Sequence, residues 1–313
     1  MNIVFFGTSS FAGEVFAFLQ KQPACEIIAL VTRPDRPRGR DLELQPSPLK
    51  AKALALGAQV PLFQPIKAST EEFAETLRAL SPDLFVVVAY GEIIKQNLLD
   101  IPRFGCINIH ASLLPKYRGA APIQRAIMNG ERETGITIIE MVQALDAGPM
   151  LKQKMVLIQD SATFGEVEQS LLEAACCAVL ETIHDIEKGS VLKIEQDHEQ
   201  ATYASKLRPE DERLDWNKPA EALYHQIRAL SPFPGAWCFI RLGQGEKRLK
   251  IRRAALRKDV AGLPGEILER SKSNLIVACG EGSLQLLEVQ IEGKKSMPIQ
   301  EFLQGSQRLL NFL

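Results

Sequence analysis

Three polar residues have side chains and positions suited to acyl transfer. Asn108 and His110 lie two residues apart in an apolar segment, so on a strand they project from the same face. Asp146 follows in a turn that contains Gly and Pro. An Asn amide and a protonated imidazole can stabilise an oxyanion, and a neighbouring carboxylate favours and orients the imidazolium. Together these residues predict direct attack of an amine on an acyl group, with no need for Cys106 or Ser112 as a covalent nucleophile.

Each of these residues also has an ordinary structural explanation. Asn108 and His110 fit a strand end and a core position, and Asp146 fits a turn that its side chain stabilises by bonding to the backbone. The combination favours catalysis only if the fold brings Asp146 beside the other two. The order of the surrounding elements therefore matters.

The segments around the three residues alternate between apolar runs and helical patterns. This alternation over about 140 residues predicts a doubly wound α/β sheet, in which ligands bind at the carboxyl ends of the strands. Ser69 with Glu72, and Thr163 with Glu166, have the spacing of capping boxes at two helix starts. The expected strands cover residues 2–6, 26–32, 59–63, 83–89, 106–109 and 135–141, and the expected helices end near residue 20, cover 49–56, 122–129 and 163–187, and follow Ser69.

The second half of the chain has a different pattern. Residues 219–230 predict a short helix, and five short β-rich runs follow, separated by Gly or charged turns. Five such strands predict a small β-barrel of the oligonucleotide-binding kind. We therefore expect a catalytic domain over residues 1–189, a linker over 190–207 and a barrel domain over 208–313. The expected barrel strands cover 236–242, 249–255, 265–268, 274–279 and 284–291.

Charge is distributed unevenly, although the whole chain carries only -1. Residues 1–205 hold 19 Lys and Arg against 25 Asp and Glu, a net -6, whereas residues 206–313 hold 18 against 13, a net +5. A basic barrel favours contact with a nucleic-acid backbone, and a merely charged hairpin is the alternative. The candidate RNA contacts on this segment are Lys247, Arg248, Lys250, Arg252 and Arg253.

A Pro/Arg-rich loop after the second expected strand adds further cations. Arg33, Arg36, Arg38 and Arg40 fall on a stiff segment that is long for an ordinary connection. Such arginines either remain solvated or grip phosphates beside the active face. The glycine-rich start at residues 7–13 lacks both GxGxxG and Gly-Lys-Ser/Thr, which argues against a dinucleotide or P-loop site.

Other features limit the class of protein. The composition, 46% hydrophobic and 24% charged, is typical of soluble globular proteins, and we expect neither an export signal nor a membrane span. The six cysteines include no CxxC pair, and the four histidines include no HxxxH pair. We therefore expect free thiols, a cytoplasmic location and no metal.

These motifs also carry a resemblance to a known family. The chain resembles the methionyl-tRNA formyltransferases along its length, from Phe6-Gly7-Thr8 to Gly293-Lys294-Lys295. The Asn-x-His motif with Ser112-Leu113-Leu114-Pro115 is similar to that of enzymes that use 10-formyltetrahydrofolate. A smaller group of these enzymes shares the second motif, Arg118-Gly119-Ala120-Ala121-Pro122-Ile123-Gln124. Further matching segments are Arg33-Pro34-Asp35-Arg36-Pro37, Pro46-Ser47-Pro48, Val86-Val87-Val88-Ala89-Tyr90-Gly91 and Leu145-Asp146-Ala147-Gly148.

The resemblance implies a Rossmann-like first domain, an oligonucleotide-binding-like barrel, and formylation of the α-amino group of initiator methionyl-tRNA in translation initiation. It implies catalysis by Asn108, His110 and Asp146, with 10-formyltetrahydrofolate as co-substrate and no metal. We expect a monomer. The implied donor site comprises Ser112, Leu113, Leu114 and Pro115, with Tyr90, Gly91, Glu92, Ile93 and Ile94 along the pterin.

Two departures from the family pattern accompany the resemblance. Asp41-Leu42-Glu43 stands where relatives often carry lysine, so the phosphate contacts of this loop would rest on its arginines, and Ala144 replaces a frequent glycine. The nearest alternative is a formyltransferase acting on an amino sugar nucleotide or a glycinamide ribonucleotide. The enzyme acting on glycinamide ribonucleotide needs no basic barrel. The enzyme acting on an amino sugar nucleotide commonly carries a fused dehydrogenase domain. An RNA-binding module on an inactive α/β domain is a further alternative, but it leaves the Asn, His and Asp without a role.

Overall fold

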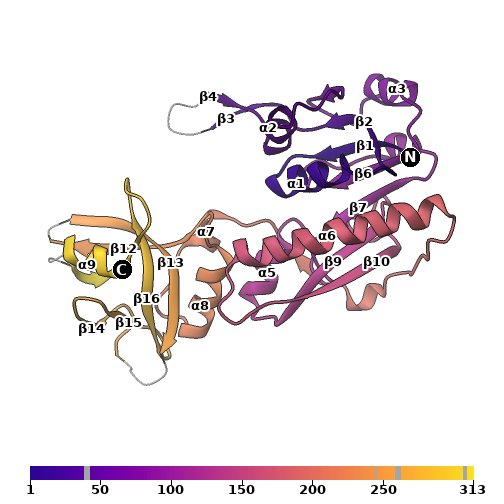
Figure 1. The fold of residues 1–313 in the computed structure, drawn as a ribbon. Coiled ribbons are helices and arrows are strands. Elements are labelled where there is room, and N and C mark those ends of the chain that lie inside the picture. The colour runs from indigo at the N-terminus through magenta and orange to yellow at the C-terminus, as the bar shows by residue number, and fades with distance from the viewer. Residues whose placement is uncertain (39–42, 244, 258–261, 306–308) are drawn as a thin grey trace. The chain divides into compact units, whose positions relative to one another are not determined.

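The computed structural model describes residues 1–38, 43–243, 245–257, 262–305 and 309–313. The chain divides into two compact units (Figure 1). The sheet unit comprises Met1–Gly119, Thr134–Leu157 and Glu168–Tyr203, and the barrel unit comprises Ala120–Glu133, Ile158–Val167 and Ala204–Leu313. Because the two units interleave along the sequence, the domain boundaries expected at residues 189 and 207 stay a prediction.

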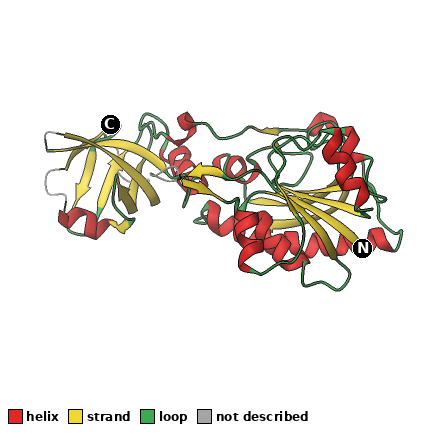
Figure 2. Ribbon diagram, turned by 90° about the horizontal axis from the view of Figure 1, so that it is seen from above, coloured by secondary structure: helices red, strands yellow, loops and turns green. Residues whose placement is uncertain are grey.

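The sheet unit is built on seven strands in the order β10-β9-β7-β6-β1-β2-β5, with helices on both sides of the sheet (Figure 2). β1 (Asn2–Gly7) pairs in parallel with β2 (Glu26–Val31) and with β6 (Leu84–Val88), and β6 pairs in parallel with β7 (Cys106–His110). The expected α/β, Rossmann-like fold is thus confirmed. The other strands are β5 (Leu62–Phe63), β9 (Glu133–Glu140) and β10 (Met150–Leu157), and the helices are α1 (Ser10–Leu19), α2 (Pro48–Ala55), α3 (Glu71–Ala79), α4 (Gln96–Leu99) and α6 (Phe164–Glu187), which belongs to this unit from Glu168 on.

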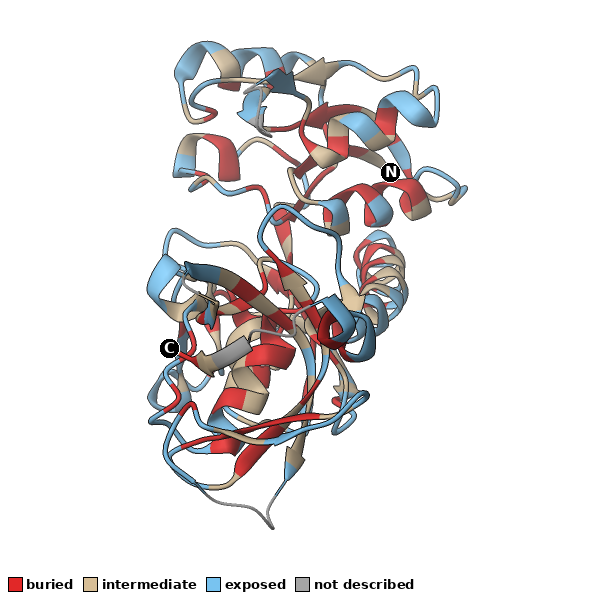
Figure 3. Ribbon diagram, turned by 90° about the vertical axis from the view of Figure 1, so that its left-hand side faces the viewer, coloured by how far each residue is buried: buried red, intermediate tan, exposed pale blue. Residues whose placement is uncertain are grey.

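The central strands form because they can be buried on both faces. In β1, residues Ile3 to Phe6 are all 0% exposed, and β6 is equally apolar. The Phe6 ring packs 5.0 Å from Phe85 and edge-on to Tyr90 at 5.4 Å between ring centroids. Figure 3 shows these strands as buried. The core therefore lies directly under the loops that follow β1, β2 and β6.

One edge of the sheet differs from the sequence prediction. β9 pairs with β7 in antiparallel register, with Asn108 opposite Ile139 and His110 opposite Thr137. The sequence pattern predicts no strand at β10, because Lys152 and Lys154 interrupt its apolar residues. β10 nevertheless forms as the edge strand of the sheet, where alternate side chains can stay exposed.

Polar side chains cap the starts of α1, α2, α3 and α6. At α6, the Glu166 carboxylate accepts the Thr163 backbone N–H at 2.8 Å, as the predicted capping box requires. This bond and the Arg253 guanidinium lower the pKa of Glu166 to about 2. The capping box predicted at Ser69 is wrong, because Thr70 caps α3 and the Ser69 hydroxyl bonds instead to the backbone of residues 93 and 95.

The barrel unit carries an antiparallel sheet in the order β14-β15-β16-β13-β12-β18. The Phe312 N–H donates to the Gly265 carbonyl at 3.3 Å, which nearly closes the barrel. Ala236, Cys238 and Ile240 are all 0% exposed, the two-residue period of a strand with one buried face. The expected barrel is thus confirmed. Its strands are β12 (Ala236–Leu242), β13 (Gly245–Arg257), β14 (Ile267–Arg270), β15 (Leu275–Ala278), β16 (Ser283–Ile291), β17 (Met297–Pro298) and β18 (Leu309–Phe312), and its helices are α5 (Pro122–Met128), α7 (Pro209–Glu212), α8 (Ala220–Ala229) and α9 (Ile299–Gly305).

Short elements also occur in segments that the sequence predicts as loop or linker. β3 (Arg36–Arg38) and β4 (Glu43–Gln45) form a hairpin within the Pro/Arg-rich loop, and β8 (Arg118–Gly119) pairs with β11 (Tyr203–Ala204). The 3-10 turn His198–Gln200 lies just before β11. Among the described residues, no helix is both long and apolar enough to cross a membrane.

Candidate active site

The Asp146 carboxylate lies beside both candidate catalytic residues of β7. Its Oδ1 accepts a hydrogen bond from the Asn108 amide at 3.3 Å, and its Oδ2 accepts the Gly119 backbone N–H at 2.8 Å. The fold therefore brings the three sequence-predicted residues together, as the catalytic interpretation requires. Because a side-chain amide carries two N–H groups, Asn108 can hold Asp146 and donate to an oxyanion at the same time.

The His110 ring lies between two acceptors. Its Nδ1 is 3.6 Å from Asp146 Oδ2, and its Nε2 is 2.9 Å from the Tyr117 carbonyl. The side chains of His110 and Asp146 are only 5% and 12% exposed. Both ring nitrogens therefore face oxygen acceptors to which a ring N–H can donate.

The turn that carries Asp146 is tightly confined. Asp146 has φ +47°, in the left-handed region that few residues other than glycine adopt. Gly148 packs so closely on the Glu140 carbonyl that a β-carbon there would overlap the oxygen. The turn can pass over the end of β9 only because position 148 has no side chain.

Two of the four residues of the predicted donor segment after β7 are buried. Ser112 is 0% exposed and its hydroxyl donates to the Lys116 carbonyl at 2.6 Å, while Leu114 is 3% exposed. Thr137 donates to the Ser112 carbonyl at 2.7 Å and accepts the Leu114 N–H at 3.1 Å. The buried side chains of Ser112 and Leu114 therefore shape the segment. Leu113 and Pro115, in contrast, are partly exposed.

The second predicted donor segment, residues 90–94, forms a turn after β6. Tyr90 and Ile94 are buried, and burial together with the Glu92 charge raises the pKa of Tyr90 to about 12. Ile93, in contrast, is 72% exposed, and Gly91 is exposed with φ +81°. Glu92 pairs with Arg33 and accepts the Ala68 N–H at 3.0 Å. The turn is thus tied to the loop that follows β2.

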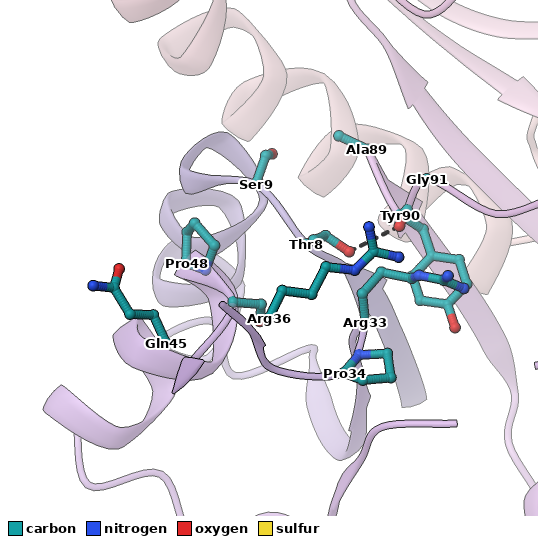
Figure 4. Close-up of a pocket in the computed structure, with 11 residues that line it drawn as sticks. Thr8, Ser9, Arg33, Pro34, Arg36, Gln45, Pro48, Ala89, Tyr90 and Gly91 are labelled. Atoms are coloured by element: carbon teal, nitrogen blue, oxygen red, sulfur yellow. Dashed lines mark hydrogen bonds between the residues drawn. The ribbon is translucent and has the colours of Figure 1, made fainter. Parts of the chain in front are cut away.

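A pocket lies at the carboxyl ends of β1, β2 and β6. Its volume is about 360 Å³, and Arg36 extends across it toward Tyr90 (Figure 4). The Thr8 hydroxyl closes one wall by donating to the Tyr90 carbonyl at 2.8 Å. Arg33 also lines the pocket, but its charge is matched by Glu92. Arg40 lies outside the described residues, and Arg38 is placed only as part of β3.

The five candidate cations of β13 have unequal surroundings. Arg253 pairs with Glu166 at 2.7 Å, and Arg248 pairs with Glu212 at 3.7 Å while stacking 3.9 Å from the Trp237 ring. Lys250 and Arg252 donate to the carbonyls of residues 234 and 232. Burial, and then the charges of Arg252 and Arg248, lower the pKa of Lys250. Lys247 is exposed on the same strand.

Sequence reasoning missed several parts of this site. The Gly119 N–H and the Tyr117 carbonyl are backbone groups, which no residue type announces. The Arg33–Glu92 pair joins residues 59 positions apart. Gln196 donates to the carbonyls of Asp146 and Gly148 at 2.9 and 2.7 Å, yet it lies in the expected linker, where no motif surrounds it. Among the described residues, no group of three His, Cys, Asp or Glu side chains is arranged to hold a metal ion.

Comparison with known sequences gives the class of this fold and site. The family described as "Formyl transferase" matches residues 1–183, and "Formyl transferase, C-terminal domain" matches residues 206–307. The chain is therefore a formyl transferase. A methionyl-tRNA formyltransferase of Protochlamydia amoebophila is 47% identical over 100% of this chain and 98% of its own, and that of Moorella thermoacetica is 45% identical over 97% and 96%. The chain belongs to the methionyl-tRNA formyltransferase family.

Solved structures share the fold at low sequence identity. WlaRD, a sugar 3N-formyl transferase studied in the presence of dTDP and 5-N-formyl-THF, has a TM-score of 0.64 at 19% identity, over 94% of this chain and 99% of that one. HypX from Aquifex aeolicus in complex with tetrahydrofolic acid has a TM-score of 0.62 at 18% identity, over 96% of this chain. This chain spans 46% of the length of HypX.

The confinement of Gly148 leads to a first prediction. Gly148→Ala should displace the Asp146 turn, lower the formyl-transfer rate by about tenfold or more, and cost about 1–3 kcal/mol of unfolding free energy. Steady-state kinetics and thermal denaturation measure the two effects. Gly305→Ala is the matched control, because a β-carbon at Gly305 meets open space. Normal activity of Gly148→Ala would show that the position of this turn does not matter for transfer.

Proposed function

We propose that this chain transfers the formyl group of 10-formyltetrahydrofolate to the α-amino group of initiator methionyl-tRNA. The observation that carries the proposal is the joint contact of Asp146 with Asn108 and His110, in a chain with full-length relatives named methionyl-tRNA formyltransferase. The geometry supports acyl transfer, and the relatives support the acceptor.

The reaction needs no covalent enzyme intermediate. The amine nitrogen attacks the formyl carbon and forms a new C–N bond, and the carbonyl oxygen becomes an oxyanion that Asn108 stabilises by hydrogen bonding while His110 adds positive charge. Asp146 receives the proton that the amine loses. The bond from the formyl carbon to folate N10 then breaks, the proton passes to N10, and the products are the formamide and tetrahydrofolate.

The donor site is proposed at the turn of residues 90–94 and at Ser112 to Pro115. The exposed Ile93 side chain offers an apolar surface for the flat pterin ring, and the exposed backbone at Gly91 permits close approach. Ser112 and Leu114 act through the shape of their segment, because both are buried. These features support folate binding by backbone and apolar contacts.

The acceptor end is proposed to reach the pocket beside β6. Arg36 extends across that pocket, and no ion pair neutralises it among the described residues. Its guanidinium can therefore donate to a phosphate. Arg38 and Arg40 belong to the same proposed contact region. Arg33 contributes indirectly, by joining the acceptor loop to the donor turn through Glu92.

The barrel is proposed to bind the backbone of tRNA through Lys247, Arg248, Lys250, Arg252 and Arg253. Burial lowers the pKa of Lys250 most, and repulsion by the Arg252 and Arg248 charges lowers it further. A bound phosphate would relieve this repulsion, and the release of counterions from RNA would add to affinity. A cytoplasmic location and a monomer accord with the proposal, since one chain supplies every proposed catalytic group.

A direct assay tests the proposed function. Purified protein is supplied with 10-formyltetrahydrofolate and with charged initiator tRNA, an amino sugar nucleotide or glycinamide ribonucleotide in parallel. We expect formylation of the methionyl-tRNA alone. Transfer to one of the small acceptors, with none to methionyl-tRNA, would overturn the assignment of the acceptor.

The second prediction concerns the oxyanion. Asn108→Ala should lower kcat about 10²-fold or more, as for loss of an oxyanion donor, with little change in KM for either substrate. Steady-state kinetics at saturating donor separates the two parameters, and circular dichroism checks the fold. Near-normal turnover of a folded Asn108→Ala protein would remove Asn108 from the mechanism.

The third prediction separates the two proposed RNA-binding regions. Changing Arg36, Arg38 and Arg40 together to Gln should raise KM for methionyl-tRNA and leave folate binding unchanged. The salt dependence should become shallower, by a slope of about one for each phosphate that is no longer bound. Changing Lys247, Lys250 and Arg252 to Gln should weaken binding of cognate and noncognate tRNAs alike.

A matched charge change controls this experiment. Lys21, Arg78 and Arg103 are exposed cations of the sheet unit, and their change to Gln alters net charge equally without touching the proposed RNA-binding residues. Both sets of RNA-binding variants should bind tRNA less tightly than this control. Equal affinity and equal salt dependence of all three proteins would contradict the proposed RNA-binding regions.

A further inference from the structure

Gln196 lies at the centre of a buried hydrogen-bond network. Its Oε1 accepts from Nε and Nη2 of Arg118 at 3.1 and 2.7 Å. Its Nε2 donates to the carbonyls of Asp146 and Gly148 at 2.9 and 2.7 Å. The side chain is 4% exposed, and its amide makes as many bonds as its two N–H groups and two lone pairs allow. An amide that is buried and fully bonded in this way holds its partners in fixed positions.

The same network reaches the Asp146 carboxylate from a second side. Arg118 is also 4% exposed, and its Nη2 lies 2.9 Å from Nδ1 of His198. The next residue, Gly119, donates its N–H to Asp146 Oδ2 at 2.8 Å. Gln196 thus bonds directly to the backbone of Asp146. It also bonds to Arg118, whose neighbour Gly119 bonds to the Asp146 carboxylate.

The backbone of Asp146 needs such support. A residue other than glycine at φ +47° costs about 1 kcal/mol or more, and it persists only where its surroundings favour it. The two bonds from Gln196 fall on the carbonyls of Asp146 and Gly148, within the turn that carries this strained residue.

We propose that Gln196 is a positioning residue for formyl transfer: it fixes the Asp146 turn against buried Arg118, so that the carboxylate stays beside Asn108 and His110. The segment expected as a linker, residues 190–207, then contributes to the transfer site. This inference rests on the proposed function.

Gln196→Glu separates support of the turn from packing. A carboxylate keeps the size of the side chain and still accepts from Arg118, but it has no N–H to donate and faces the two carbonyls with negative charge. We expect kcat for methionyl-tRNA to fall by about tenfold to 10²-fold, with KM for both substrates changed less than about threefold. If this variant does not fold, Gln196→Asn, which is too short to span both sides, takes its place.

Gln226→Glu is the matched control. Gln226, which is partly exposed, donates to the carbonyls of Asp211 and Arg213 at 2.7 and 3.0 Å within the barrel unit, so its change removes two hydrogen bonds of similar length elsewhere. We expect its kcat to equal that of the wild type. An equal loss of activity in both variants would assign the effect to general destabilisation and overturn the proposal.

The NMR signal of the His110 ring gives a readout that does not depend on activity. Because His110 lies 3.6 Å from Asp146, its Cε1–H signal should move in Gln196→Glu toward its position in Asp146→Asn, and should not move in Gln226→Glu. An unchanged signal, a kcat within twofold of the wild type, or a change confined to KM would each overturn the proposal. If the wild type does not formylate methionyl-tRNA, the proposed function fails, and the His110 signal alone decides the role of Gln196.

Discussion

The carboxylate of Asp146 joins segments that are distant in the sequence. One oxygen accepts from the Asn108 amide of β7, the other accepts from the Gly119 backbone, and the same carboxylate faces His110. Hydrogen bonds to an ionised group are about twice as strong as neutral ones, and their strength increases where water is excluded. With the Asp146 side chain only 12% exposed, this interaction orients both the Asn108 amide and the His110 imidazole. The reactive geometry of the site therefore depends on where the turn places one carboxylate.

The position of the turn that carries Asp146 is set by strand register, by close packing and by hydrogen bonds from residues that take no part in the reaction. The antiparallel register of β9 against β7 brings residue 139 opposite Asn108, and the chain then turns back over Glu140 at Gly148. Gln196 bonds the turn from a segment about 50 residues later. The charged residues are similarly differentiated by their surroundings. Arg33 pairs with Glu92 and so joins the loop after β2 to the turn of residues 90–94, whereas Arg36 lines the pocket and has no ion pair within the part of the chain that the structure describes. Equal charges in the sequence thus have unequal roles in the structure.

Local features of the sequence predicted the parts of the fold that depend on local physics. The apolar runs of β1 and β6, the two-residue spacing of Asn108 and His110, and the Thr163–Glu166 cap follow from patterns within a few residues. The polar residues of edge strand β10 resemble a loop. The cap expected at Ser69 fails because its hydroxyl bonds to the backbone of residues 93 and 95, which lie far away in the sequence. The motifs indicate Asn108, His110 and Asp146, which the fold brings together. They did not indicate Gln196 or the Gly119 N–H, because those interactions arise only when separate segments fold together.

Replacing Asp146 by Asn tests the central claim most directly, because it removes the charge while keeping the size of the side chain. Single-turnover formyl transfer to methionyl-tRNA should be measured with saturating enzyme and 10-formyltetrahydrofolate, after circular dichroism and donor-binding measurements confirm an intact fold. The account predicts that the rate of the chemical step falls by about 10²-fold to 10⁴-fold, because the group that receives the proton is lost, while donor affinity stays unchanged. A folded Asp146→Asn protein that binds the donor and transfers the formyl group at the wild-type rate would contradict it.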